Sequence, residues 1–279
     1  GDIRYNHSTN FLAFLGQGNA TEMARFDSSG KLGIGTTAPA TKFDLRDGTL
    51  TLSDADVAHG LTGIEPTNTF GFMRPRSATD GGNLVYGLSD SVGGPGIDIN
   101  GVIGVTDPTD TVPAVIINSY KSDGGTSVAA LAAAETSIQF RNGGTSYLTM
   151  LGNGNFGFGD TSPAAVLTVG SGDLFQVNSS GQVETNGSAP AVSACGTSPA
   201  MQANASDVAG KVTTGTGTFS ACTVTFATAY TNAPSCQCAD ETTSLATPLR
   251  CTTTTTTLVI QGPTITASDV LSYICVGLR

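Results

Sequence analysis

The most informative pattern along the chain is an alternation of apolar residues with glycine, and it occurs twice. Residues 26–45 read FDSSGKLGIGTTAPATKFDL, and residues 150–169 read MLGNGNFGFGDTSPAAVLTV. In both copies a turn precedes a short strand whose apolar side chains share one face, because successive strand side chains point to opposite faces. The alternating glycines leave the other face bare. Glycine weakens a strand unless another backbone comes close, so we expect a close backbone approach there.

The two copies align when Gly30 is placed on Gly154. The identical pairs are then Gly33/Gly157, Gly35/Gly159, Thr37/Thr161 and Pro39/Pro163. A third, partial copy covers residues 175–183, FQVNSSGQV. In the first copy, residues 36–39 interrupt the strand, and the alternation resumes at residues 42–45.

A strand pair of this size is not stable alone in water, and the repeat offers no second layer of its own. We therefore predict that neighbouring copies of the chain supply the missing layer in an elongated, intertwined, homotrimeric β fibre. The residues expected in this trimer core are Leu32, Ile34, Phe43, Leu45, Phe156, Phe158, Leu167 and Val169.

The rest of the chain also predicts strands. Between the repeats, turn clusters at residues 79–82, 93–96 and 122–125 separate short apolar segments, including 97–105 and 112–117, which indicates an all-β module. Residues 128–135, VAALAAAE, are the one helix candidate. The predicted organisation is an N-terminal fibre segment with the first repeat (1–48), an inserted all-β module (49–146), a shaft and linker with the second and partial third repeats (147–190), and a cysteine-rich β head (191–279).

The last segment has the period-2 pattern of a β-sandwich-like head. Cys222, Val224 and Phe226 share one face of a predicted strand, and the β-branched run 252–260 and residues 272–276 predict further strands. All six cysteines lie in this segment. They are Cys195, Cys222, Cys236, Cys238, Cys251 and Cys275.

This clustering predicts disulfides in an oxidising environment. Cys236 and Cys238 lie two residues apart in a predicted strand, so their side chains share a face. Six cysteines allow 15 connectivities, and the sequence does not choose among them. Free buried thiols are the alternative, followed by a metal site. A zinc site would favour cysteine pairs with the spacing Cys-x2-Cys, or accompanying histidines. The two histidines, His7 and His59, lie far upstream.

Composition narrows the function classes. Charged residues make up 12% of the chain, which excludes a coiled coil or helical bundle rich in Glu and Lys. A net charge of −10 disfavours nucleic acid as a partner. Since the sequence has no run of 18 apolar residues, we expect no membrane insertion. Because it begins at Gly1 rather than at a methionine, we expect a processed chain or a fragment.

Candidate chemistry is sparse. Residues 152–157 match the pattern G-x-G-x-x-G, but no helix follows, as a dinucleotide site requires. His59 near Asp54 and Asp56 formally allows a catalytic triad, although a polar turn residue is the simpler interpretation. Asp80 and the segment 107–110, DPTD, suggest calcium, against the simpler alternative of Asx turns. We expect no enzymatic activity, no cofactor and no bound metal.

The repeat GKLGIGTTAPATKFDL, with its weaker copy GNFGFGDTSPAAVLTV, resembles the GIGTT-x-P repeat of bacteriophage tail-fibre-like proteins and related bacterial surface proteins. The resemblance implies a structural, receptor-binding fibre on a virion tail or at a cell surface, attaching to a host cell. It carries over no catalytic residue, because the matching positions are turn glycines, prolines and core residues.

Three functions stay open. The first is this fibre, whose partners are copies of itself and a host cell-surface glycan or protein. The second is a cell-surface adhesin or polymeric filament subunit, and the third is a glycan depolymerase on a fibre scaffold. We expect contact with the receptor through loops between residues 228 and 252. The candidate contact residues are Tyr230, Asn232, Asp240, Glu241 and Arg250.

Overall fold

The computed structural model of the protein is all-β. It describes residues 1–16, 18, 21–56, 58–77, 79, 81–89, 95–100, 113–217, 219–242, 248–262 and 265–279. These residues form 24 strands, and there is no α-helix among them. Accordingly, none of them belongs to a helix able to cross a membrane. The chain separates into two compact units, Gly1–Ile116 and Ile117–Arg279.

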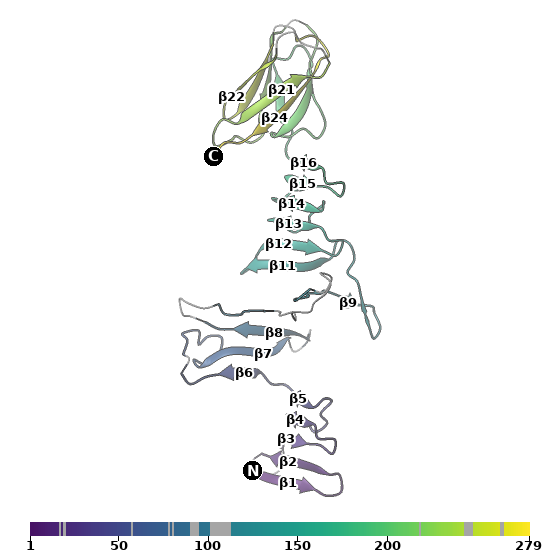
Figure 1. The fold of residues 1–279 in the computed structure, drawn as a ribbon, viewed down its shortest axis with the longest axis vertical. Coiled ribbons are helices and arrows are strands. Elements are labelled where there is room, and N and C mark those ends of the chain that lie inside the picture. Colours follow the sequence, from purple (N-terminus) through teal and green to yellow (C-terminus); the bar gives the residue numbers. More distant parts are fainter. Residues whose placement is uncertain are drawn as a thin grey trace, which may run out of the picture. The chain divides into compact units, whose positions relative to one another are not determined.

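The first unit begins with a five-stranded sheet in the order β1-β2-β3-β4-β5 (Figure 1). Its strands are β1 (Asp2–Asn6), β2 (Phe11–Leu15), β3 (Glu22–Phe26), β4 (Leu32–Ile34) and β5 (Phe43–Leu45). The first three pairings are antiparallel, whereas β4 and β5 are parallel. The interruption predicted at residues 36–39 is therefore the connection between these two parallel strands.

A second sheet of this unit is formed by β6 (Leu50–Ser53), β7 (Thr69–Ser77) and β8 (Gly81–Gly87). It confirms β structure in the predicted insert. Residues 97–100 and 113–117, expected as apolar strand segments, form no strand. The remainder of those segments and residues 93 and 94 lie outside the described residues.

The second unit opens with the short pair β9 (Lys121–Ser122) and β10 (Val128–Ala129), followed by a six-stranded sheet. That sheet contains β11 (Thr136–Asn142), β12 (Thr145–Leu151), β13 (Phe156–Phe158), β14 (Leu167–Val169), β15 (Phe175–Val177) and β16 (Val183–Thr185). It begins earlier than the shaft boundary predicted at residue 147. Its β13 and β14 are parallel, as β4 and β5 are in the first copy.

The helix candidate at residues 128–135 is wrong. Its first two residues form β10, and the segment ends in a turn in which the Glu135 amide donates to the Ala132 carbonyl at 3.0 Å. The Glu135 carboxylate accepts the Ala132 amide at 2.5 Å, which closes this turn. Alanine-rich composition alone does not nucleate a helix over so few residues.

The turn of the repeat has the same backbone hydrogen bonds in all three copies. The amide of Gly30 donates to the Asp27 carbonyl at 3.0 Å, and the Asp27 amide donates to the Lys31 carbonyl at 2.9 Å. Equivalent bonds occur at residues 151–155 and 178–182. The glycine whose amide closes this turn has a positive φ in each copy, 69° at Gly30, 86° at Gly154 and 77° at Gly181. Glycine adopts this conformation without steric cost.

The bare strand face is confirmed as a place of close backbone approach. A Cβ on Gly33 would lie 2.8 Å from the Thr36 carbonyl oxygen, and a Cβ on Gly157 would lie 2.6 Å from the Asp160 carbonyl oxygen. In both copies the loop that follows folds back over the strand, and its proline, Pro39 or Pro163, is buried. Glycine is therefore required where the connection crosses its own strand.

Residues 191–279 form a sandwich of two four-stranded sheets, ordered β17-β20-β23-β22 and β18-β19-β24-β21. The first contains β17 (Ala191–Ser193), β20 (Ala221–Thr225), β23 (Thr257–Gln261) and β22 (Arg250–Thr253). The second contains β18 (Ala200–Met201), β19 (Ala209–Thr213), β24 (Val270–Val276) and β21 (Ser235–Asp240). We call this body the head.

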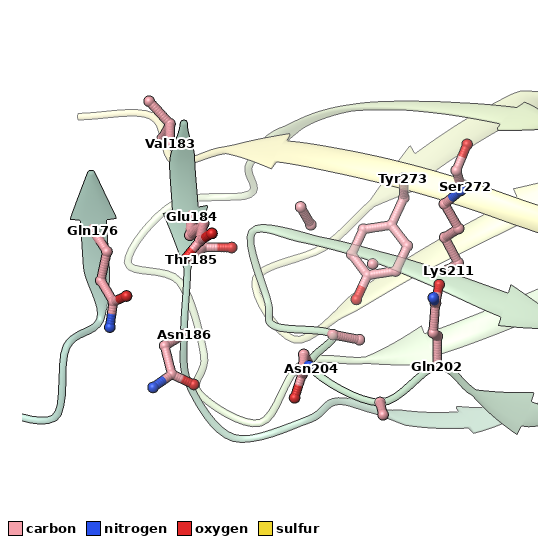
Figure 2. A pocket seen from close by; sticks show the side chains of 14 residues that line it. Gln176, Val183, Glu184, Thr185, Asn186, Gln202, Asn204, Lys211, Ser272 and Tyr273 are labelled. Atoms are coloured by element: carbon pink, nitrogen blue, oxygen red, sulfur yellow. The ribbon is translucent and has the colours of Figure 1, made fainter. Parts of the chain in front are cut away.

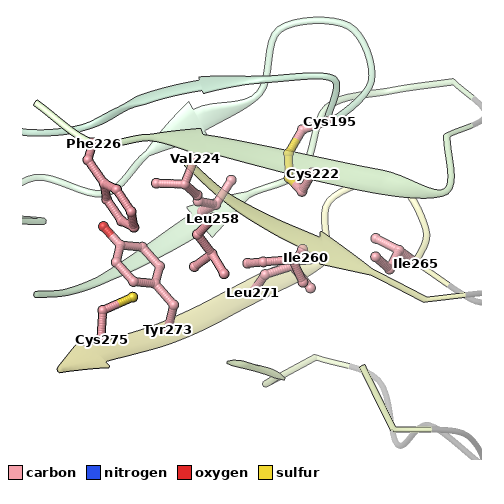
Figure 3. Packing of buried hydrophobic residues seen from close by; sticks show 11 residues of the cluster. Cys195, Cys222, Val224, Phe226, Leu258, Ile260, Ile265, Leu271, Tyr273 and Cys275 are labelled. Carbon is pink, nitrogen blue, oxygen red and sulfur yellow. A yellow bond between two sulfur atoms is a disulfide. The ribbon is translucent and has the colours of Figure 1, made fainter. Parts of the chain in front are cut away.

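The head has a core of its own between the two sheets (Figure 3). Val224, Leu258, Ile260 and Leu271 are completely buried there, with Tyr273 beside them. The predicted inward face of residues 222–226 is confirmed, because Cys222, Val224 and Phe226 are all buried. The threonine run forms a hairpin rather than one strand, since the Thr254 hydroxyl accepts the amides of Thr256 and Thr257 and closes a turn.

Candidate functional site

The six-stranded sheet carries two continuous apolar rows on one face. Strand register places each member directly opposite the next on the neighbouring strand. One row is Phe140, Leu148, Phe158, Val169 and Phe175, and the other is Ile138, Met150, Phe156, Leu167, Val177 and Val183. We call these rows the apolar ladders. Phe158 is 46% exposed and Val169 is 43% exposed, so this face is open to solvent in the single chain.

The five-stranded sheet of the first unit has the same arrangement. Its two apolar ladders are Ile3, Phe14, Ala24, Ile34 and Leu45, and Tyr5, Leu12, Phe26, Leu32 and Phe43. Phe43 is 51% exposed and Ile34 is 38% exposed. The same design therefore occurs in both compact units.

The opposite face of the six-stranded sheet is polar, yet it is the covered one. Its central row reads Gln139, Thr149, Gly157, Thr168, Gln176 and Glu184. Thr149 and Thr168 are completely buried, and the Thr168 hydroxyl donates to the Asp160 carboxylate at 2.9 Å. The folded-back loop thus covers the polar face and leaves the apolar face uncovered, the reverse of the usual half-buried sheet.

All eight residues expected in a trimer core belong to these ladders. Four are exposed, namely Ile34, Phe43, Phe158 and Val169. The other four are only half-buried by their own chain, namely Leu32, Leu45, Phe156 and Leu167. The structure thus brings the predicted set together as two one-sided surfaces, and the single chain does not bury either of them.

All six cysteines are paired, and all three bonds lie in the head. The pairs are Cys195–Cys222, Cys236–Cys275 and Cys238–Cys251. Cys236 and Cys275 face each other directly across β21 and β24, whereas Cys238–Cys251 joins β21 of one sheet to β22 of the other. The sequence predicted disulfides, and the folded structure supplies the connectivity.

The five candidate receptor-contact residues fall at two ends of the head. Tyr230 and Asn232 lie at the end where the chain enters: the Tyr230 amide donates to the Thr255 carbonyl, and the Asn232 side chain donates to the Leu278 carbonyl. Asp240, Glu241 and Arg250 lie at the opposite end, where β21 ends and β22 begins. They therefore do not form one patch.

Tyr230 and Glu241 make further contacts within the head. The Tyr230 ring packs edge-on against Phe226 with centroids 4.9 Å apart, and its hydroxyl donates to the Asp207 carbonyl. Burial, followed by the Asp207 charge, raises the pKa of Tyr230 above 10.0. The Glu241 carboxylate accepts from Lys211 Nζ at 2.5 Å, and this bond is the main reason that its pKa lies below 4.5.

A polar cavity of about 690 Å³ lies between β15 and β16, the last two strands of the six-stranded sheet, and the head (Figure 2). Figure 2 shows Gln176, Glu184 and Asn186 on one side and Gln202, Asn204, Lys211 and Tyr273 on the other. A hydrogen bond of 2.8 Å between the hydroxyls of Thr185 and Ser206 joins the two sides. The Tyr273 hydroxyl donates to the Ser206 carbonyl at 2.7 Å, and burial raises the pKa of Tyr273, so this group is a neutral donor.

No pattern in the sequence indicates this cavity. One side of the cavity belongs to the partial third repeat and the residues directly after it. The other side belongs to segments of the head that come later in the chain. The polar residues of these two segments do not differ in type from their neighbours. Only the fold that juxtaposes them distinguishes them.

The structure also places the other residues that the sequence offered as candidates for binding or catalysis. Residues 152–157 form the repeat turn and the start of β13, not a loop leading into a helix. His59 is buried, and its Nδ1 accepts the Leu61 amide at 3.1 Å. Among the described residues, no three His, Cys, Asp or Glu side chains gather as metal ligands. Asp80 and the segment 107–110 lie outside the described residues.

No protein-family model matches the chain, and no curated protein matches it in sequence.

Proposed function

We propose that this chain is a subunit of a homotrimeric β fibre that attaches to a cell surface through its head. The observation that carries the proposal is the reversed polarity of the two repeat sheets. Each exposes two apolar ladders, and in each a folded-back loop crosses the opposite face at a glycine, Gly33 or Gly157. Association would bury the apolar ladders, which the single chain leaves exposed to water.

Copies of the same chain are the occupant that fits best. Each short repeat strand presents two apolar residues on one face, and every strand of the sheet adds the same contribution along the ladder. A closed three-chain arrangement lets the three equivalent faces meet at a common axis, so no ladder stays in water. Burial of apolar surface contributes about 25 cal/mol per Å², so covering both ladders of each sheet favours association.

The head fits the attaching end of such a fibre. It has its own hydrophobic core and three disulfides, so it is a rigid body that does not depend on the ladders for its interior. Disulfides of this kind persist in oxidising environments, which agrees with a place on a virion tail or at a cell surface.

Electron microscopy of the purified protein tests this proposal. Discrete rods of uniform length are expected for a closed trimer. Filaments of indefinite length would instead support the polymeric surface-filament alternative, because open head-to-tail contacts do not close. Compact single particles of one chain would contradict both.

A further inference from the structure

The side chains around the cavity of Figure 2 have unused hydrogen-bonding capacity. The side-chain amides of Gln176, Gln202 and Asn204 line it, and none of the three has a hydrogen-bond partner within the part of the chain that the structure describes. Each amide offers both donors and an acceptor. A ligand that enters is therefore met by groups able to pair with either type of hydrogen-bonding atom.

Among the described lining residues, the one cation, Lys211, is already paired, and the one carboxylate, Glu184, accepts only from a neutral amide. Lys211 Nζ is held by Glu241 at 2.5 Å, and the Glu184 carboxylate accepts from the Asn178 side-chain amide at 2.7 Å. No further cation lines the cavity among the residues that the structure describes, and the whole chain carries a net charge of −10. A phosphate, sulfate or nucleotide ligand would have to approach without a compensating positive charge, so the electrostatics disfavour an anionic ligand.

The size and the apolar part of the lining complete the description. The volume of about 690 Å³ is within the range of roughly 300–1,000 Å³ of small-molecule sites. Between the polar groups, Ala205 and Ala209 supply small apolar surfaces. A lining that alternates amides with small apolar patches matches a molecule whose hydroxyls alternate with C–H faces.

We propose that this cavity binds a neutral oligosaccharide. In the context of the proposed fibre, whose attachment role it rests on, the ligand is a surface glycan held beside the last shaft strands. Gln176, Gln202 and Asn204 pair with sugar hydroxyls, and Glu184 accepts from a further hydroxyl. Glu184 is the one carboxylate among the described lining residues, and glycoside hydrolysis uses two, so the site binds without cleaving.

Saturation-transfer NMR of the full chain with short glucan, galactan and N-acetylglucosamine oligosaccharides tests this proposal. At least one of them is expected to receive saturation from the protein, and calorimetry then gives its affinity. The triple variant Gln176→Ala, Gln202→Ala and Asn204→Ala, and separately Glu184→Gln, should weaken binding about tenfold or more, a loss of about 1.4 kcal/mol. Gln261→Ala, an exposed glutamine at the far end of the head, is the control and should bind as the parent does.

The possible results separate the two proposals. Absence of saturation transfer to all three sugars, or equal affinity in parent and cavity variants, overturns the cavity assignment. Release of new reducing ends during incubation overturns binding without cleavage. The mass of each sample in solution is measured alongside. A trimer that binds no sugar leaves the fibre proposal standing, whereas a monomer that binds sugar contradicts the fibre and keeps the cavity.

Discussion

The buried hydroxyl of Thr168 donates a hydrogen bond to the Asp160 carboxylate at 2.9 Å, and the first repeat has these two residue types in exchanged positions. With Gly30 placed on Gly154, Thr36 occupies the position of Asp160 and Asp44 that of Thr168. Both Thr36 and Asp160 accept the amide two residues later, at 3.2 and 2.9 Å. In the first copy Asp44 accepts the Ala40 amide at 2.9 Å, so polar residues at these two positions hold the folded-back loop in both copies.

Replacing Thr168 with valine is expected to destabilise the second unit by about 1–3 kcal/mol, because the buried Asp160 oxygen loses its donor. Chemical denaturation of the parent and the variant measures the difference. Combining Asp160→Thr with Thr168→Asp, which copies the first repeat, should recover part of the loss. An unchanged midpoint for Thr168→Val would show that this pair does not hold the loop.

Two glycines of the same sheet should respond oppositely to alanine. Gly157→Ala places a Cβ about 2.6 Å from the Asp160 carbonyl oxygen and should destabilise the protein by about 1–3 kcal/mol. Gly144→Ala meets nothing within 4 Å and has no positive φ, so it should be neutral or stabilise by up to about 1 kcal/mol. Thermal unfolding compares them. Equal effects would contradict the close approach of the loop.

Reduction should destabilise the head selectively. The three disulfides all lie in residues 195–279, and residues 1–194 contain no cysteine. Loss of a native disulfide in a small secreted domain costs about 2–5 kcal/mol. Hydrogen exchange with and without reductant should show faster exchange in β20, β23 and β24 and unchanged exchange in β12 to β14. Equal protection of the head in both conditions would contradict a structural role of these bonds.

The turn at Asp27 should be sensitive to acid. The Asp27 carboxylate accepts the amides of Lys31 and Ser29, chiefly the former, which holds its pKa below 3.8. A lowered folded-state pKa means that the contribution is complete above pH 3.8 and is lost as the pH falls through the folded value. The Lys31 amide resonance should therefore shift in acid.

Asn178 makes the same two bonds in the third copy without a titrating group, so Asp27→Asn should keep the turn and abolish the shift. NMR titration of both proteins gives the comparison. The same acid shift in Asp27→Asn would assign it to another group.

The sequence predicts more of the repeats than of the head. Gly30 and Gly154 predict the turn of each copy, and the alternation around Gly33 and Gly157 predicts the strand. These signals are readable because each lies within a few neighbouring residues. Disulfide pairing and the ends at which Tyr230 and Glu241 lie depend on the register of distant strands, which local patterns do not specify. The cavity beside Glu184 and Lys211 needs two segments juxtaposed by the fold, and its residue types are common throughout the chain.

The mass of the protein in solution, by sedimentation at micromolar concentration, tests most directly whether the apolar ladders are buried between chains. The parent should sediment at three times the chain mass of 28.1 kDa. Phe158→Asp, which places a charge in a ladder, should sediment at 28.1 kDa, whereas Thr145→Asp, which adds the same charge outside the ladders, should keep the parent mass. A parent protein of 28.1 kDa, or a Phe158→Asp variant that assembles unchanged, would contradict the account.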